Sequence, residues 1–284
     1  MRPLKIVTCL VVTLAIAGCS SLERKSAVPA QALSKAQIAG LPSVRYAIST
    51  QAGVDAMVDD LAKLEAARGK KAFDGDANYL ALSGGGDDGA FGAGLLVGWS
   101  KQGSRPNFNL VTGISTGALI APFAYLGKEY DPTLQQVYTN IQPKDIFIER
   151  GILSGILSDG LADSTPLYQL ISKYVDDAFL KKIAYEYNTN GRWLLIGTTN
   201  IDAGLPVIWN MGRIATIGTP EALELFRRIM LASASIPGAF SPVMFDFLID
   251  GQAFQEMHVD GGASTQVFLY PSCLLYTSPS PRAS

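Results

Sequence analysis

The stretch that decides the fold is FNLVTGISTGALIAPFAYL, residues 108–126. It opens with a strand-like apolar run, Phe108–Thr112, and closes with a helix-like run, Ala118–Leu126. Between the two runs, Ser115 stands at the centre of the turn Gly113–Gly117, with a glycine at each end. A strand-to-helix turn this tight lifts the serine hydroxyl clear of the backbone, and glycines tolerate its crowding. Ser115 is therefore a candidate nucleophile.

A second glycine turn follows the preceding strand of the sequence. Residues 79–82 predict a short buried strand, Gly84-Gly85-Gly86 a turn, and residues 90–101 an apolar helix. Consecutive unhindered backbone N–H groups at a helix N-terminus favour negative charge. Two successive strand–loop–helix units indicate parallel strands joined by right-handed crossovers, which is an α/β arrangement. A nucleophile beside an anion-binding loop is the minimum equipment for acyl transfer.

The first glycine turn also matches a nucleotide-binding pattern. Residues 84–89, GGGDDG, fit G-x-G-x-x-G, but that pattern needs an acidic residue at the end of the next strand to bind a ribose. Here the next strand ends in Gly113-Ile114-Ser115. We therefore expect no nucleotide or other cofactor, and no metal, because no cluster of side chains has the spacing of metal ligands.

The serine needs a base, and the residues offer two. The chain has one histidine, His258, so any Ser-His-Asp triad must use it. The alternative is Asp260, in an Asp-Gly-Gly turn at the end of a predicted strand. Since side chains alternate along a strand, His258 and Asp260 are expected on the same face. The residues alone leave both options open: Asp260 acts directly, or His258 acts with an acid.

From Leu82 to Gly262 the sequence resembles the patatin-like phospholipases. The resemblance lies in four blocks that follow the order of that family, with a weaker fifth. The blocks are Gly84-Gly85-Gly86, Gly113-Ile114-Ser115-Thr116-Gly117, residues 232–240 (ASASIPGAF) and Asp260-Gly261-Gly262, and the weaker segment is Gly197-Thr198-Thr199-Asn200.

The resemblance implies a patatin-like three-layer α/β fold, with a mainly parallel central sheet flanked by helices. It implies a Ser-Asp dyad in which Ser115 is the nucleophile and Asp260 the base. The oxyanion hole would be formed by the loop of Gly84, Gly85 and Gly86. The implied activity is that of a serine lipid acyl hydrolase, of the phospholipase A or esterase type, acting on a lipid or ester substrate.

One position departs from the family pattern. Asp88, preceded by Asp87, stands just before the last glycine of the loop, where the family usually has a basic residue. The exchange replaces positive with negative charge near the site. It makes a neutral ester or a zwitterionic lipid a better expected substrate than a lipid with an anionic head group.

Three other functions remain open from the sequence. A Ser-His-Asp carboxylesterase of the α/β-hydrolase type would need a histidine after the acid, and none follows Asp260. An acyltransferase would use the same dyad. A non-catalytic envelope lipoprotein would be favoured by loss of Ser115 or Asp260, and both residues are present.

The N-terminus predicts a lipoprotein. Residues 1–18 combine a basic start with an apolar run, residues 6–17, that is too short to span a bilayer comfortably. They end in a lipobox-like sequence, IAGC, so Cys19 is the expected lipidation site and membrane anchor. Ser20, and not aspartate, follows it. By resemblance to lipoprotein sorting in Gram-negative bacteria, this favours the outer membrane, with the protein facing the periplasm or the exterior.

The remaining chain divides into three predicted parts. Residues 19–76 are expected to form a tether and an amphipathic helix, at 51–68, that packs on the main domain. Residues 77–272 are expected to form the hydrolase domain, which we expect to be truncated at its C-terminus. Residues 273–284, CLLYTSPSPRAS, break the preceding pattern and are expected to be a non-native tail.

Within the main domain we expect further helices at 131–140, 166–187 and 220–235, and a hairpin turn at Asp250-Gly251. The apolar segment 151–157 is a candidate lid or acyl groove. The net charge of −2 and the absence of a basic tract exclude nucleic acid as an expected partner. Three cysteines near the two ends of the chain give no disulfide framework.

Overall fold

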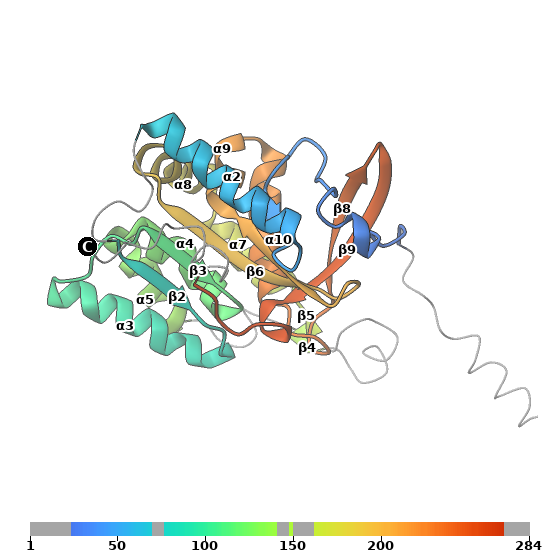
Figure 1. Cartoon of the computed structure of the whole chain (residues 1–284). Coiled ribbons are helices and arrows are strands. Elements are labelled where there is room, and N and C mark those ends of the chain that lie inside the picture. The colour runs from blue at the N-terminus through green and yellow to red at the C-terminus, as the bar shows by residue number, and fades with distance from the viewer. Residues whose placement is uncertain (1–23, 70–76, 141–147, 150–161, 270–284) are drawn as a thin grey trace, which may run out of the picture.

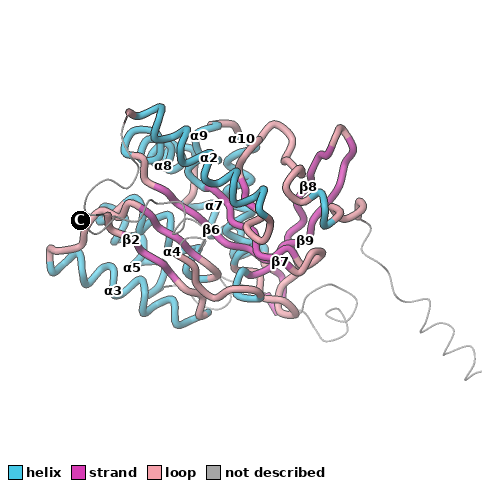
Figure 2. Tube along the Cα trace, viewed as in Figure 1, coloured by secondary structure: helices cyan, strands magenta, loops and turns pink. Residues whose placement is uncertain are grey.

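A computed structural model describes residues 24–69, 77–140, 148–149 and 162–269. The predicted signal peptide with Cys19, the segment 151–157 and the tail 273–284 lie outside these residues. Helices and strands alternate along the chain, and helices lie on both sides of the sheet (Figures 1 and 2). The α/β class predicted from the sequence is therefore present.

The bounds of the elements are as follows. The strands are β1 (Arg45–Tyr46), β2 (Tyr79–Leu82), β3 (Leu110–Gly113), β4 (Ile148–Glu149), β5 (Ala162–Asp163), β6 (Trp193–Asn200), β7 (Leu205–Asn210), β8 (Val243–Ile249) and β9 (Gln252–Asp260). The helices are α2 (Gln51–Arg68), α3 (Gly89–Gln102), α4 (Thr116–Leu126), α5 (Asp131–Asn140), α7 (Thr165–Tyr174), α8 (Asp177–Asn190), α9 (Met211–Ile217) and α10 (Pro220–Ser233). Short 3₁₀ turns include Gly86–Asp88 and Gly261–Ala263.

The main sheet is mixed, so the prediction of a mainly parallel sheet is wrong. Its order is β1-β7-β6-β3-β2, with β9 beside β6 and β8 beside β9. Only the pairs β2–β3 and β3–β6 are parallel; the pairs of β7 with β1 and β6, and of β9 with β6 and β8, are antiparallel. The reason is connection length, because β7 and β9 follow tight turns, whereas parallel neighbours need long crossovers.

One edge of β6 positions the candidate site. β3 pairs with the first half of β6, ending with Gly113 opposite Ile196. β9 pairs with the end of β6, where Asp260 lies opposite Thr198. Both strands therefore end at Gly197, from opposite directions. The turn after β3 and the turn after β9 are brought together at that residue.

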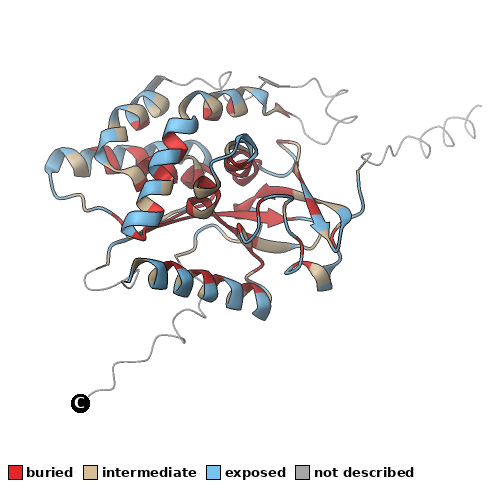
Figure 3. Ribbon diagram, turned by 90° about the horizontal axis from the view of Figure 1, so that it is seen from above, coloured by how far each residue is buried: buried red, intermediate tan, exposed pale blue. Residues whose placement is uncertain are grey.

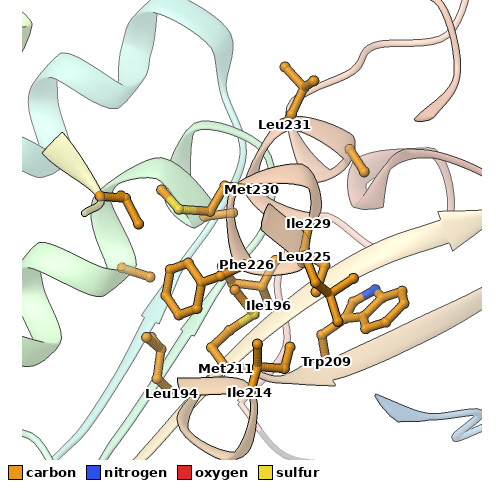
Figure 4. Packing of buried hydrophobic residues seen from close by; sticks show 14 of the residues in the cluster. Leu194, Ile196, Trp209, Met211, Ile214, Leu225, Phe226, Ile229, Met230 and Leu231 are labelled. Carbon is orange, nitrogen blue, oxygen red and sulfur yellow. The ribbon is translucent and has the colours of Figure 1, made fainter. Parts of the chain in front are cut away.

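The two faces of the sheet are covered by different helices. On one face, alternate residues of β6 pack with α4, α8, α9 and α10 in the larger core cluster. In Figure 4, Phe226 and Met230 of α10 pack near Leu194 and Ile196 of β6. Figure 3 shows the buried residues concentrated in the strands and the inward sides of the helices.

On the other face, α2 covers the sheet through Met57 and Leu64, which pack with Leu110 and Leu195. The prediction that the helix at 51–68 packs on the main domain is therefore confirmed. The layers are α2, the sheet and the remaining helices, in agreement with three layers.

Two further expectations differ from the structure. Residues 24–50, expected as a tether, pack into the core through apolar residues such as Leu33 and Val44, and β1 extends the sheet. The helix expected at 166–187 is two helices, because Asp176 accepts a hydrogen bond from the N–H of Phe179 (2.8 Å) and starts a new one. The hairpin turn is confirmed, with φ of 49° at Asp250 and 81° at Gly251. Every helix in the described part of the chain is too short or too polar to cross a bilayer.

Candidate active site

Ser115 lies in a strained turn between β3 and α4. Its φ of 56° and ψ of −128° fall in a region that residues other than glycine rarely adopt. The flanking glycines permit this turn: a Cβ on Gly113 would lie 2.5 Å from the carbonyl oxygen of Gly117, and one on Gly117 would lie 2.3 Å from that of Leu82. The structure thus places Ser115 at a sharp strand-to-helix turn, as the sequence predicts.

The backbone of Ser115 is held by a buried serine whose role cannot be read from the sequence. The N–H of Ser115 donates to Oγ of Ser233 (3.0 Å), and that hydroxyl donates to the carbonyl of Gly197 (2.7 Å). Ser233 is completely buried at the end of α10. It lies in the ASASIPGAF block, so the motif was visible in the sequence, but the bond that gives it a role joins distant segments.

The glycine loop lies directly against the serine. A Cβ on Gly84 would lie 2.9 Å from Cβ of Ser115, so only glycine fits there. Thr116 ties the loop to α4, because its hydroxyl donates to the carbonyl of Gly86 (2.8 Å). The loop and the nucleophile turn therefore form one unit.

The expected oxyanion hole needs one correction. The N–H of Gly84 donates to the carbonyl of Gln266 (3.2 Å) and is not free for a ligand. Within the described residues, the N–H groups of Gly85 and Gly86 make no such bond, and both residues are exposed. The candidate oxyanion donors are therefore Gly85 and Gly86. The sequence could not show this, because the competing carbonyl comes from beyond β9.

Asp260 ends β9 and faces Ser115. Its Oδ1 accepts a hydrogen bond from the N–H of Gly262 (2.7 Å), and its own N–H donates to the carbonyl of Ser235 (2.8 Å). Burial raises the pKa of Asp260, while hydrogen bonding from Ser115 and Gly262 lowers it in part. Only 4% of Asp260 and 6% of Ser115 is exposed, so the pair is largely shielded from water. A carboxylate with a raised pKa is a stronger proton acceptor than an ordinary aspartate.

His258 is on the same face of β9 as Asp260 but is bonded elsewhere. Its Nδ1 lies 2.8 Å from Oγ1 of Thr198, and its Nε2 lies 2.9 Å from the carboxylate of Glu256. The ring is completely buried, and burial lowers its pKa. Both ring nitrogens are thus engaged with partners other than Ser115. This geometry does not support His258 as the base, and it leaves Asp260 as the residue beside the nucleophile.

The acidic pair after the glycine loop faces solvent. Asp87 and Asp88 are exposed, and Asp88 precedes α3 without making a side-chain capping bond. The loop therefore presents negative charge beside the site entrance.

Comparison with known proteins agrees with this geometry. The family model for patatin-like phospholipases matches residues 80–270, about two thirds of the chain. The match includes the glycine loop, Ser115 and Asp260. No curated protein matches the chain.

Proposed function

The chain belongs to the patatin-like phospholipase family, and on this premise we propose that it is a serine lipid acyl hydrolase with a Ser115–Asp260 dyad. The observation that carries the proposal is the meeting of the two residues at Gly197, where β3 and β9 end against the same edge of β6. Hydrogen bonding from the Ser115 side chain lowers the pKa of Asp260, which supports a contact between the two groups.

In the first step, Asp260 accepts the proton of the Ser115 hydroxyl as Oγ attacks the carbonyl carbon of an ester. The negative charge then develops on the carbonyl oxygen. The N–H groups of Gly85 and Gly86 bind that oxygen, and losing one such donor typically lowers the rate by about 100-fold or more. When the tetrahedral intermediate collapses, the bond to the alcohol breaks, and Asp260 returns its proton to the leaving oxygen. The acyl group is left on Ser115.

In the second step, water attacks the acyl-enzyme. Asp260 accepts a proton from the water, and the same glycine N–H groups bind the second oxyanion. Ser115 leaves with the proton held by Asp260, which restores the starting state and releases a carboxylic acid. Each proton thus moves among Ser115, Asp260, the substrate and water, and the two steps need no co-reactant other than water.

The charge at the loop favours one class of substrate. Asp87 and Asp88 are exposed beside the oxyanion donors, and they would repel the phosphate of an anionic head group that carries no compensating cation. A zwitterionic phospholipid or a neutral ester meets less repulsion at this position. We propose such molecules as substrates. We also propose that a lipid anchor on Cys19 holds the protein at the bacterial outer membrane, beside these substrates.

A fluorophosphonate probe tests the proposal, because it labels only an activated serine. We expect labelling of the wild-type protein and none of Ser115→Ala. The matched control is Ser83→Ala, which removes an exposed serine next to the glycine loop and should label like the wild type. Labelling of Ser115→Ala at the wild-type rate would overturn the assignment of the nucleophile.

A further inference from the structure

Large apolar side chains are exposed in three of the segments that contact the candidate site. The exposed fraction is 75% for Phe91, 45% for Ile236 and 47% for Val267. Exposure of apolar side chains of this size to water is unfavourable, so a group of them on the surface of a protein indicates a binding surface.

Each of the three lies one or two residues along the chain from a residue that contacts the site. Phe91 is two residues after Gly89, where a Cβ would lie 1.9 Å from the side chain of Thr116. Ile236 follows Ser235, whose carbonyl accepts the N–H of Asp260. Val267 follows Gln266, whose carbonyl accepts the N–H of Gly84. Three separate segments that contact the site thus each carry an exposed apolar side chain.

The exposed side of α3 continues this apolar character. From Gly89 to Ser100 the helix has no charged residue, and Leu95, one turn after Phe91, is 58% exposed. Gly94 and Gly98 are also exposed and lie within one turn of Leu95. The solvent side of a helix normally carries charged and polar residues, so this side is suited to contact with an apolar phase.

The N-terminal end of the described chain lies at the same end of the sheet. Arg24 forms an ion pair with Asp202 (2.7 Å), in the turn that follows the C-terminal end of β6. Ile201, which precedes Asp202 in the same turn, is 40% exposed. Figure 1 shows the first described residues beside β8 and β9. Arg24, the first described residue, therefore lies at the end of the sheet that carries Ser115.

We propose that Phe91, Leu95, Ile236 and Val267 form a surface that docks on a zwitterionic phospholipid bilayer, with the entrance to Ser115 facing the lipid. Side chains of this kind insert among the head groups and the first part of the acyl chains, without spanning the membrane. The proposal rests on the proposed function for its biological purpose. Its main test, however, measures binding and requires no hydrolysis.

The test measures quenching of tryptophan emission by phosphatidylcholine vesicles with brominated acyl chains. The full chain carries Ser115→Ala, so that it does not hydrolyse the lipid. Tryptophan is introduced at single positions by Phe91→Trp or Ile236→Trp. The matched control is Tyr185→Trp, because Tyr185 is 59% exposed on α8, which ends just before β6 begins, away from the site. The natural tryptophans Trp99, Trp193 and Trp209 give the same background in every variant.

We expect the brominated lipid to quench the emission of the tryptophans at 91 and 236 at least twofold more than that at 185. Equal quenching at all three positions would overturn the proposal, because the anchor alone would then hold the protein without a preferred face. Absence of quenching at 91 and 236 would also overturn it. If those positions are instead protected by a second copy of the chain, sedimentation will show a dimer, and the surface is a protein interface.

A second readout separates this proposal from the proposed function. In the catalytic protein, the triple variant Phe91→Ser, Ile236→Ser, Val267→Ser should lower the ratio of vesicle hydrolysis to dissolved-ester hydrolysis at least tenfold. Tyr185→Ser should leave that ratio within twofold of the wild type. An unchanged ratio in the triple variant refutes the docking surface. A wild-type protein that hydrolyses neither substrate refutes the function, while the quenching result still decides the docking.

Discussion

Ser233→Ala is the substitution by which the assembly of the site can be tested most directly. The hydroxyl of Ser233 accepts the N–H of Ser115 and donates to the carbonyl of Gly197. Alanine removes both bonds and adds no atom, so the N–H and the carbonyl lose a partner in a fully buried place. An unsatisfied buried group costs about 1–3 kcal/mol. We therefore expect the free energy of unfolding to fall by about 2–4 kcal/mol.

The same substitution should affect catalysis. Ser115 is held at a φ of 56°, a conformation that costs about 1–3 kcal/mol and persists only where the surroundings enforce it. Without the bond to Ser233, the Ser115 hydroxyl should shift relative to Asp260 and the glycine loop. Misplacement of a nucleophile by about 1 Å can lower the rate about 100-fold. We expect kcat for a p-nitrophenyl ester to fall by about 10- to 100-fold, with little change in KM.

Ser235→Ala is the matched control for this experiment. Ser235 is also buried, in the same turn, but its hydroxyl donates to the carbonyl of Leu231 (2.8 Å), which already accepts the N–H of Ala234. Removal of the Ser235 hydroxyl leaves no backbone group without a hydrogen-bond partner, and it should lower the free energy of unfolding by about 1 kcal/mol. Urea unfolding and ester hydrolysis are measured for both variants. The reasoning fails if Ser233→Ala unfolds at the same urea concentration as Ser235→Ala and keeps kcat within twofold of the wild type.

Three further predictions concern the dyad, the charge of Asp260 and the lipid anchor. Ser115→Ala and Asp260→Ala should each abolish hydrolysis of a p-nitrophenyl ester. His258→Ala should lower stability but keep the kcat of the folded protein within a few-fold of the wild type. If folded His258→Ala were as inactive as folded Asp260→Ala, a triad would be favoured. Burial raises the pKa of Asp260 in the folded protein. The protonated carboxyl therefore stabilises the fold at a pH below the ordinary pKa of aspartate, and this stabilisation is lost as the pH rises through the raised pKa. Asp260→Asn should therefore be more stable than the wild type at neutral pH, but not in acid, and a urea titration that shows no gain at neutral pH contradicts this. Cys19→Ser should release the protein from membranes, and a wild-type protein that takes up no palmitate analogue would count against the anchor.

The parts of the site that could be predicted are those set by local chain geometry. The glycines on either side of Ser115 and at the start of the glycine loop predict tight turns. At these positions a Cβ would lie within 3 Å of backbone atoms or of the Ser115 side chain, so only glycine fits. The Asp-Gly-Gly turn after β9 is equally local. The residues that these turns bring together were therefore visible in the sequence, in their order along the chain.

The parts that could not be predicted depend on contacts between distant segments. The N–H of Gly84 is bonded to Gln266, far along the chain, so its loss as an oxyanion donor left no local signal. Ser233 acts through a bond to Ser115. Residues 24–50 lack a helical or strand period because they reach the core through single side chains, such as Leu33 and Val44, and not through one continuous face.

A buried ion pair connects this N-terminal segment to the base. Arg45 of β1 binds the carboxylate of Glu256, which is completely buried on β9. Burial alone would raise the pKa of Glu256, but hydrogen bonding from His258 and the charge of Arg45 outweigh it and lower the pKa. Leaving such a carboxylate without its partner costs about 3–5 kcal/mol.

Asp260 lies on the same strand, four residues beyond Glu256 and two beyond His258. The position of this strand therefore depends on Arg45, which the sequence predicts to lie in a tether. His258, which first suggested a triad, serves instead to hold Glu256 and Thr198 in place. We infer that the unit required to present Asp260 to Ser115 begins well before residue 77, because the charge that neutralises Glu256 comes from β1.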